Sequence, residues 1–247
     1  MREVNPQELL ERICPQRLCY FSEYLDLTRP RALEDYSVRC YANDEGRCLA
    51  MTWQYPAWNY ASFIGYDGEF CREVLRQFDE TDACWPLPPS AVLPGVKLHG
   101  LRKKDVVEAF AYEGPVPEAP IDPHILLLEK EAFGPLRSIA PRQADLDHLP
   151  LAFAWMEEGR PLGYLACGPM VEDIWDVGYI FTLPEQRGRG IGTVLAYAYL
   201  KTMRERGEIP YYSGVSNPHS AGAARGAGFQ LCSARHSFHY KRPKFKA

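Results

Sequence analysis

Residues 177–192 read VGYIFTLPEQRGRGIG, and this stretch sets the fold of the C-terminal half of the chain. Its apolar first part predicts a strand, and its glycine-rich turn opens an amphipathic helix that we expect over residues 191–206. The first turn of a helix has backbone N–H groups without intrahelical partners, at the positive end of the helix dipole. Glycines let another group approach this backbone, and Arg187 and Arg189 add positive charge. The stretch therefore predicts an anion site suited to a pyrophosphate.

Other interpretations of this turn are possible. A strand-to-helix connection that binds nothing could use the same glycines, so the turn alone is a weak signal. The sequence has no G-x-x-x-x-G-K-S/T motif, which excludes a P-loop. The glycines do not follow G-x-G-x-x-G, and no acidic ribose partner lies about twenty residues further on, which excludes the dinucleotide motif.

The segments around this turn predict an α+β fold with a mixed sheet flanked by helices. In the C-terminal part, alternating and apolar runs predict strands over residues 124–128, 151–156, 161–167, 177–182 and 210–215 and from residue 229, and a helix over 218–226. In the N-terminal part, the patterns predict a helix capped by Asn5, strands over 48–53 and 61–65, and a helix over 69–78.

Prolines cluster over residues 114–123, and we place a domain boundary there. The expected domains are an N-terminal α/β domain, residues 1–118, and a C-terminal domain, residues 119–247. Between the first two strands of the C-terminal domain, residues 141–149 leave room for only one short helix.

Two separated motifs in the C-terminal part resemble those of a known superfamily. The segment RGRGIG, Arg187 to Gly192, resembles the R-x-x-G-x-G signature of the GNAT acyl-CoA N-acyltransferases. Residues 212–217 resemble the GNAT strand that ends in Asn, and Asn217-x-x-Ser220 followed by Gly-Phe at 228–229 resembles the segment after it. The resemblance covers about residues 124–240. It implies a GNAT-like fold and allows the N-terminal domain to be a degenerate GNAT-like lobe that walls the acceptor side and binds no CoA.

The resemblance also implies how acetyl-CoA binds. The N–H groups of Arg187 to Thr193 would hold the pyrophosphate, and the backbone of residues 181–183 would pair with the pantetheine arm and stabilise the oxyanion. Asn217 would bind the arm, and Ser220 would lie near the thiol. The full binding set is Phe181, Thr182, Leu183, Arg187, Gly188, Arg189, Gly190, Ile191, Gly192, Thr193, Asn217 and Ser220.

Catalysis requires a base for the ammonium and an acid for the leaving thiolate. The resemblance places the base at Asp176, with Glu172 and Asp173 as alternatives that could act through water. Many relatives carry the acid as a Tyr seven residues after the Asn, where this chain has Ala224. Ser220, Tyr211, Tyr212 and solvent stay open as replacements.

These observations predict an N-acetyltransferase that moves an acetyl group from acetyl-CoA to the primary amine of a small metabolite by direct attack. The alternatives are a non-catalytic acyl-CoA-binding or sensing module and a protein N-acetyltransferase. The net charge of −4 argues against nucleic acid as a partner. The sequence lacks a signal-peptide pattern and a membrane-spanning run, so we expect a cytoplasmic protein with no membrane partner. Eight scattered cysteines predict no metal site. A homodimer stays open.

Overall fold

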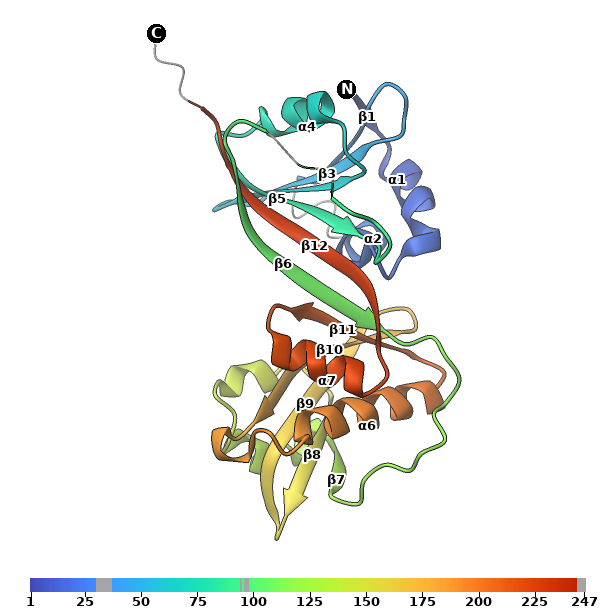
Figure 1. Cartoon of the computed structure of the whole chain (residues 1–247), viewed down its shortest axis with the longest axis vertical. Helices are drawn as coiled ribbons and strands as arrows, with labels where there is room; N and C mark the ends of the chain where they lie inside the picture. Colours follow the sequence, from blue (N-terminus) through green and yellow to red (C-terminus); the bar gives the residue numbers. More distant parts are fainter. Residues whose placement is uncertain (30–36, 94, 96–97, 244–247) are drawn as a thin grey trace. The chain divides into compact units, whose positions relative to one another are not determined.

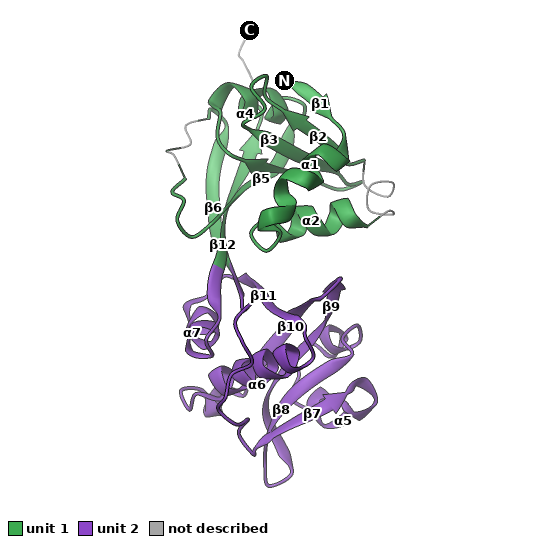
Figure 2. Cartoon of the chain, turned by 90° about the vertical axis from the view of Figure 1, so that its right-hand side faces the viewer, with its two compact units in different colours: residues 1–108, 232–247 green, residues 109–231 purple. Residues whose placement is uncertain are grey.

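The computed structural model describes residues 1–29, 37–93, 95 and 98–243. The chain divides into two compact units, residues 1–108 together with 232–247, and residues 109–231 (Figure 2). The division lies ten residues before the expected boundary, and the proline cluster falls inside the second unit. The end of the chain also differs from the expected domains, because its last strand joins the first unit. Across the described part of the chain, no helix has the length and apolarity needed to cross a bilayer.

The second unit contains the strands and helices expected around the glycine-rich turn (Figure 1). Its elements are β7 (Ile125–Glu129), η2 (Lys130–Ala132), α5 (Gly134–Arg137), η3 (Gln143–Leu146), β8 (Leu151–Glu157), β9 (Arg160–Val171), β10 (Ile174–Thr182), η4 (Pro184–Gln186), α6 (Ile191–Glu205), β11 (Ile209–Val215) and α7 (Pro218–Gly226). The sheet order is β11-β10-β9-β8-β7. All neighbours are antiparallel except β10 and β11, which are parallel.

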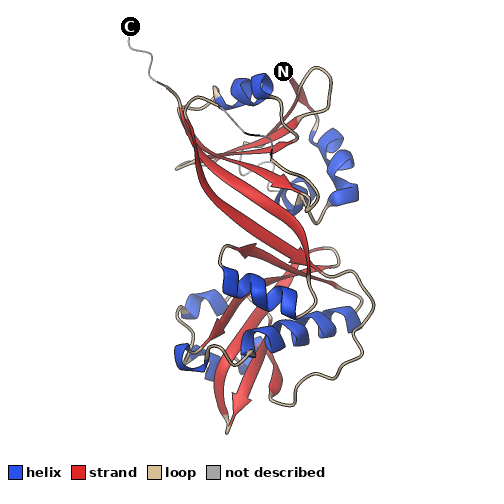
Figure 3. Cartoon of the chain, viewed as in Figure 1, coloured by secondary structure: helices blue, strands red, loops and turns tan. Residues whose placement is uncertain are grey.

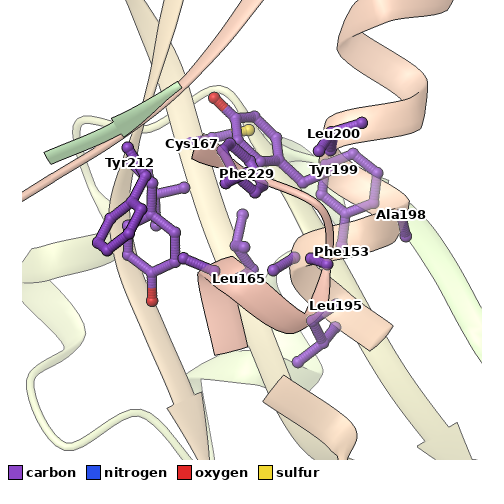
Figure 4. Packing of buried hydrophobic residues seen from close by; sticks show 14 of the residues in the cluster. Phe153, Leu165, Cys167, Leu195, Ala198, Tyr199, Leu200, Tyr212 and Phe229 are labelled. Carbon is purple, nitrogen blue, oxygen red and sulfur yellow. The ribbon is translucent and has the colours of Figure 1, made fainter. Parts of the chain in front are cut away.

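Helical segments cover both faces of this sheet. Neighbouring residues of β8 and β9 point to opposite faces, so each strand contributes side chains to the packing on both sides. Phe153 and Leu165 pack with Leu195 and Tyr199 of α6 in one buried cluster (Figure 4). Helices α6 and α7 both contribute residues to that cluster. Both helices lie in front of the strands of this unit in the view of Figure 3. Tyr164 packs on the other side with the region of α5. The one short helix expected over 141–149 is a 3-10 turn, η3, and the short α-helix α5 precedes it.

The first unit contains a similar series of elements, in the residues that the structure describes. They are β1 (Arg2–Val4), α1 (Pro6–Ile13), η1 (Cys14–Gln16), α2 (Phe21–Thr28), β2 (Arg39–Ala42), β3 (Leu49–Gln54), β4 (Asn59–Ile64), α4 (Gly68–Leu75), β5 (Glu80–Leu87), β6 (Leu101–Ala111) and β12 (Gln230–Lys241). The Asn5 cap is confirmed, since its side chain accepts a hydrogen bond from the Gln7 N–H. Phe63, Val74 and Trp85 lie at the centre of the core.

The two units repeat one topology. In each, a first strand is followed by helical segments, three antiparallel strands, a helix and a strand parallel to the one before that helix. The run β1-β2-β3-β4-α4-β5 corresponds in this way to β7-β8-β9-β10-α6-β11. This correspondence supports the interpretation of the first unit as a diverged second copy.

Candidate active site

The glycine-rich turn forms an open cradle at the start of α6. Gly188 and Gly190 both have φ of +81°, in the left-handed region that L-residues rarely adopt. A Cβ at either position would meet no atom within 4 Å. The backbone conformation, and not close packing, therefore requires these glycines, and the space in front of them is free of described protein atoms.

Backbone donors remain available in this cradle. The Arg187 N–H donates to the Pro184 carbonyl, and the Thr193 N–H donates to the Gly190 carbonyl at 3.0 Å. Between them, the N–H groups of residues 188–192 donate to no group in the described residues, and no side chain caps α6. The expected donor row from Arg187 to Thr193 is therefore shorter by one residue at each end.

An acidic side chain that the sequence analysis missed lies beside the cradle. Glu157, at the end of β8, forms an ion pair with Arg189, which also donates to Gln186. The arginine lowers the pKa of the Glu157 carboxyl. Glu157 and Gln186 also line a neighbouring cavity of about 480 Å³. The positive charge of Arg189 is thus partly neutralised. The other arginine, Arg187, donates from Nε to the Thr182 carbonyl at 3.4 Å.

Strands β10 and β11 stop pairing before β10 reaches the cradle, and the splay between them is called the slot below. The two strands pair only where residues 174–176 meet residues 209–211. Beyond Asp176 no further β10–β11 pair follows in the described residues, so the strands diverge toward the cradle. A β-bulge interrupts the pairing of β10 with β9 at Gly178, where a Cβ would come within 2.8 Å of Leu149. Unpaired edges of this kind can bind an extended ligand as an added strand.

Asp176 lies at the apex of the slot. Its two carboxylate oxygens accept hydrogen bonds from the Ser213 N–H at 3.0 Å and the Ser213 hydroxyl at 2.6 Å. The carboxylate therefore accepts a hydrogen bond from a backbone N–H of β11 just beyond the last residue pair between β10 and β11. The residue is only 9% exposed. Burial raises the pKa of the carboxyl to about 6, although the bonds from Ser213 oppose the shift.

Comparison with known proteins identifies this arrangement. Residues 121–229 match the model of the Acetyltransferase (GNAT) family. This segment is a GNAT domain. The matched segment lies within the second structural unit and contains the cradle, the slot and α7. A search of curated proteins found no match.

Solved structures resemble the chain beyond the GNAT domain. A GCN5-related N-acetyltransferase of Sphaerobacter thermophilus is 14% identical, with a TM-score of 0.54 over 100% of this chain and 96% of that one. An acetyltransferase of the GNAT family from Colwellia psychrerythraea is 13% identical, with a TM-score of 0.54 over 97% of this chain and 99% of that one. At these identities the likeness concerns the fold alone.

Other residues expected at the site lie at the start of α7, in the turn before β10 and just after β10. Asn217 caps α7, because its Oδ1 accepts from the Ser220 N–H at 2.8 Å and its Nδ2 donates to the Ser220 hydroxyl at 3.0 Å. Glu172 lies in the exposed turn between β9 and β10, with φ of +47°. Burial raises the pKa of Tyr212, a side-chain hydrogen bond with Ser220 opposes this shift, and the charge of Asp176 adds to it. The Leu183 N–H already donates to the Leu162 carbonyl.

The helix of the first unit that corresponds to α6 offers no such cradle. Asp67 caps α4, and its carboxylate accepts from the N–H groups of Glu69 and Phe70 at 3.0 and 3.1 Å. These bonds lower the pKa of Asp67. A fixed carboxylate at that position repels a phosphate, so the start of α4 does not offer a pyrophosphate site. No group of three metal-ligating side chains occurs in the described part of either unit.

Proposed function

We propose that the protein is an acetyl-CoA-dependent N-acetyltransferase that acts on the primary amine of a small metabolite. One observation carries the proposal, the row of unoccupied N–H donors over residues 188–192 at the open end of the β10–β11 slot. Such a row binds a pyrophosphate through aligned donors and the helix dipole. The slot then supplies an unpaired strand edge for a peptide-like pantetheine arm.

The residues at the slot divide the chemistry between them. In the bound complex, the acetyl thioester supplies the electrophilic carbonyl carbon. The backbone N–H groups near the bulge at Gly178 would hold the carbonyl oxygen as negative charge develops on it. Asp176 would accept the proton that the attacking amine loses, directly or through water. With a pKa of about 6 its carboxyl is mostly ionised at neutral pH and can accept that proton.

A second function is favoured by specific observations. Both oxygens of Asp176 are already hydrogen bonded, and Ala224 stands where many relatives carry a Tyr. These features support a module that binds acyl-CoA without turnover. The two functions share the CoA site and differ only in catalysis.

Thiol release from acetyl-CoA, measured against a panel of small primary amines, separates the two functions. Turnover that is lost in Asp176→Asn and kept in Glu172→Gln supports the enzyme, because Glu172 is a carboxylate of the same strand pair in an exposed turn. Micromolar acetyl-CoA binding with no turnover on any amine supports the binding module. Failure to bind CoA at all would refute both.

A further inference from the structure

Strand β7 forms an open edge of the sheet in the GNAT domain. It pairs with β8 on one side, and no strand pairs with its other side in the residues that the structure describes. Leu126 and Leu127, at the middle of β7, are 49% and 42% exposed. Because successive side chains of a strand point to opposite faces, each face of the sheet carries one of these leucines at its edge.

The other terminal strand of the strand order, β1, differs from β7 in length and charge. It has three residues, and its first two, Arg2 and Glu3, are exposed and charged. Short strands and charged side chains are common features that keep an edge from pairing with another chain. The five residues of β7 include no proline or lysine, and four of them are apolar. This edge therefore lacks the usual protection against pairing.

The backbone of β7 directs alternate residues toward β8 and toward the open edge. The His124 carbonyl accepts a hydrogen bond from the Met156 N–H, and the Lys130 N–H donates to the Pro150 carbonyl. The even-numbered residues therefore direct their backbone polar groups toward β8. The odd-numbered residues of the same strand direct theirs toward the open edge.

The outward groups form a short row of donors and acceptors. The Ile125 N–H is already used, because it donates to the Asp122 carbonyl. The Ile125 carbonyl and both backbone groups of Leu127 and Glu129 have no hydrogen-bond partner among the described residues. A strand that pairs here must therefore accept from Leu127 and Glu129 and donate to Ile125 and Leu127.

We propose that the protein forms a homodimer in which two copies of β7 pair antiparallel, centred on Leu127. Each Leu127 then exchanges both of its backbone hydrogen bonds with the partner's Leu127, and each Glu129 N–H donates to the partner's Ile125 carbonyl. A register centred elsewhere leaves part of the five-residue strand unpaired. This pairing is independent of the proposed function.

The side chains fit the same register. Leu127 lies opposite the partner's Leu127 on one face of the joined sheet, and Leu126 lies opposite the partner's Leu128 on the other face. The pairing thus covers the exposed leucines of both copies. An edge of five residues makes a small interface, so we expect a dissociation constant in the micromolar range.

The charges at the ends of the pairing are complementary. Lys130 lies opposite the partner's His124, and the Nδ1 atom of each His124 is 2.8 Å from Asp122 Oδ1 of its own chain. The ammonium group of Lys130 therefore meets a carboxylate at each end. This complementarity favours a second copy over an unrelated strand.

Sedimentation velocity of the full chain between about 1 and about 300 µM tests the dimer. The wild type should change from monomer to dimer over this range. Leu127→Lys should stay monomeric, because two like charges would face each other at the twofold axis. Val116→Lys is the matched control, since Val116 is an exposed apolar residue of the same unit at 44%, and it should associate like the wild type.

Mixing two charged variants tests the register. Leu127→Glu should also be monomeric alone, and an equal mixture with Leu127→Lys should associate again, because the twofold pairing puts residue 127 opposite itself. Both variants should melt within a few degrees of the wild type. A wild type that is monomeric throughout, a dimer that persists in Leu127→Lys, or two folded variants that do not associate when mixed would overturn the proposal.

A cross-link gives a second readout that needs no charged variant. The Cα atoms of directly opposed residues lie about 5.5 Å apart, which a disulfide can span. With the exposed Cys14 replaced by Ser, Leu127→Cys should oxidise to a covalent dimer, whereas Leu126→Cys should not. Equal cross-linking of the two cysteine variants, or none in Leu127→Cys, would refute the register.

Discussion

Replacement of Asp176 by Asn should change stability and turnover in opposite directions. Burial raises the pKa of this carboxyl from 3.8 to about 6. One pKa unit corresponds to about 1.4 kcal/mol, so ionisation of Asp176 costs the folded state about 3 kcal/mol at neutral pH. The residue is 9% exposed, so solvent screens this cost only slightly.

The sign of the effect follows from proton binding. The folded protein holds this proton more tightly than the unfolded chain, so the free energy of unfolding falls as pH rises from about 4 to about 6. Asn has no proton to lose, and its oxygen can still accept from the Ser213 N–H. Relative to the wild type, Asp176→Asn should therefore gain up to about 3 kcal/mol of stability between about pH 4 and pH 7.

Urea unfolding of the variant and the wild type at about pH 4 and about pH 7, monitored by tryptophan fluorescence, measures this gain. Between pH 4 and pH 7, kcat/KM of Asp176→Asn with acetyl-CoA and amine should be about 10²- to 10⁴-fold lower than that of the wild type, the usual contribution of a general base. Glu172→Gln, in an exposed turn, serves as the control and should alter neither quantity. A stability difference between variant and wild type that does not depend on pH would refute the raised pKa. Full activity in Asp176→Asn would refute its role as the base.

Three other substitutions, one of them with a matched control, test the cradle and the first unit. Gly190→Glu should abolish CoA binding in calorimetry, whereas Gly207→Glu, with the same φ of +81° at the far end of α6, should share the strain of about 1–2 kcal/mol and still bind CoA. Glu157→Gln should free its arginine partner and tighten CoA binding about twofold to fivefold at low salt, an effect that must fade as salt is added. Glu23→Gln should lower the free energy of unfolding by about 3 kcal/mol in chemical denaturation, because Glu23 is fully buried and the change leaves the guanidinium of Arg235, which is only 19% exposed, without its carboxylate partner. An unchanged midpoint would show that this ion pair contributes nothing.

The sequence indicated most regular elements of the GNAT domain, because their signals are local. The helix stripe of α6 and the glycines of the cradle each depend on residues within one or two turns of one another. The anion cradle could be predicted for the same reason, since donors and glycines come from one continuous segment. Strands β1, β2 and β5 of the first unit carry weaker patterns and were missed.

The tertiary structure decided what depends on residues distant in the sequence. The contact between Asp176 and Ser213 joins residues 37 apart, and the ion pair of Glu23 with Arg235 joins residues 212 apart. The same holds for the ion pair of Glu157 with Arg189 beside the cradle. A sequence pattern records which side chains are apolar or charged within one element. Partners across a sheet are chosen by the free energy of burying both elements together, which a pattern within either one does not contain.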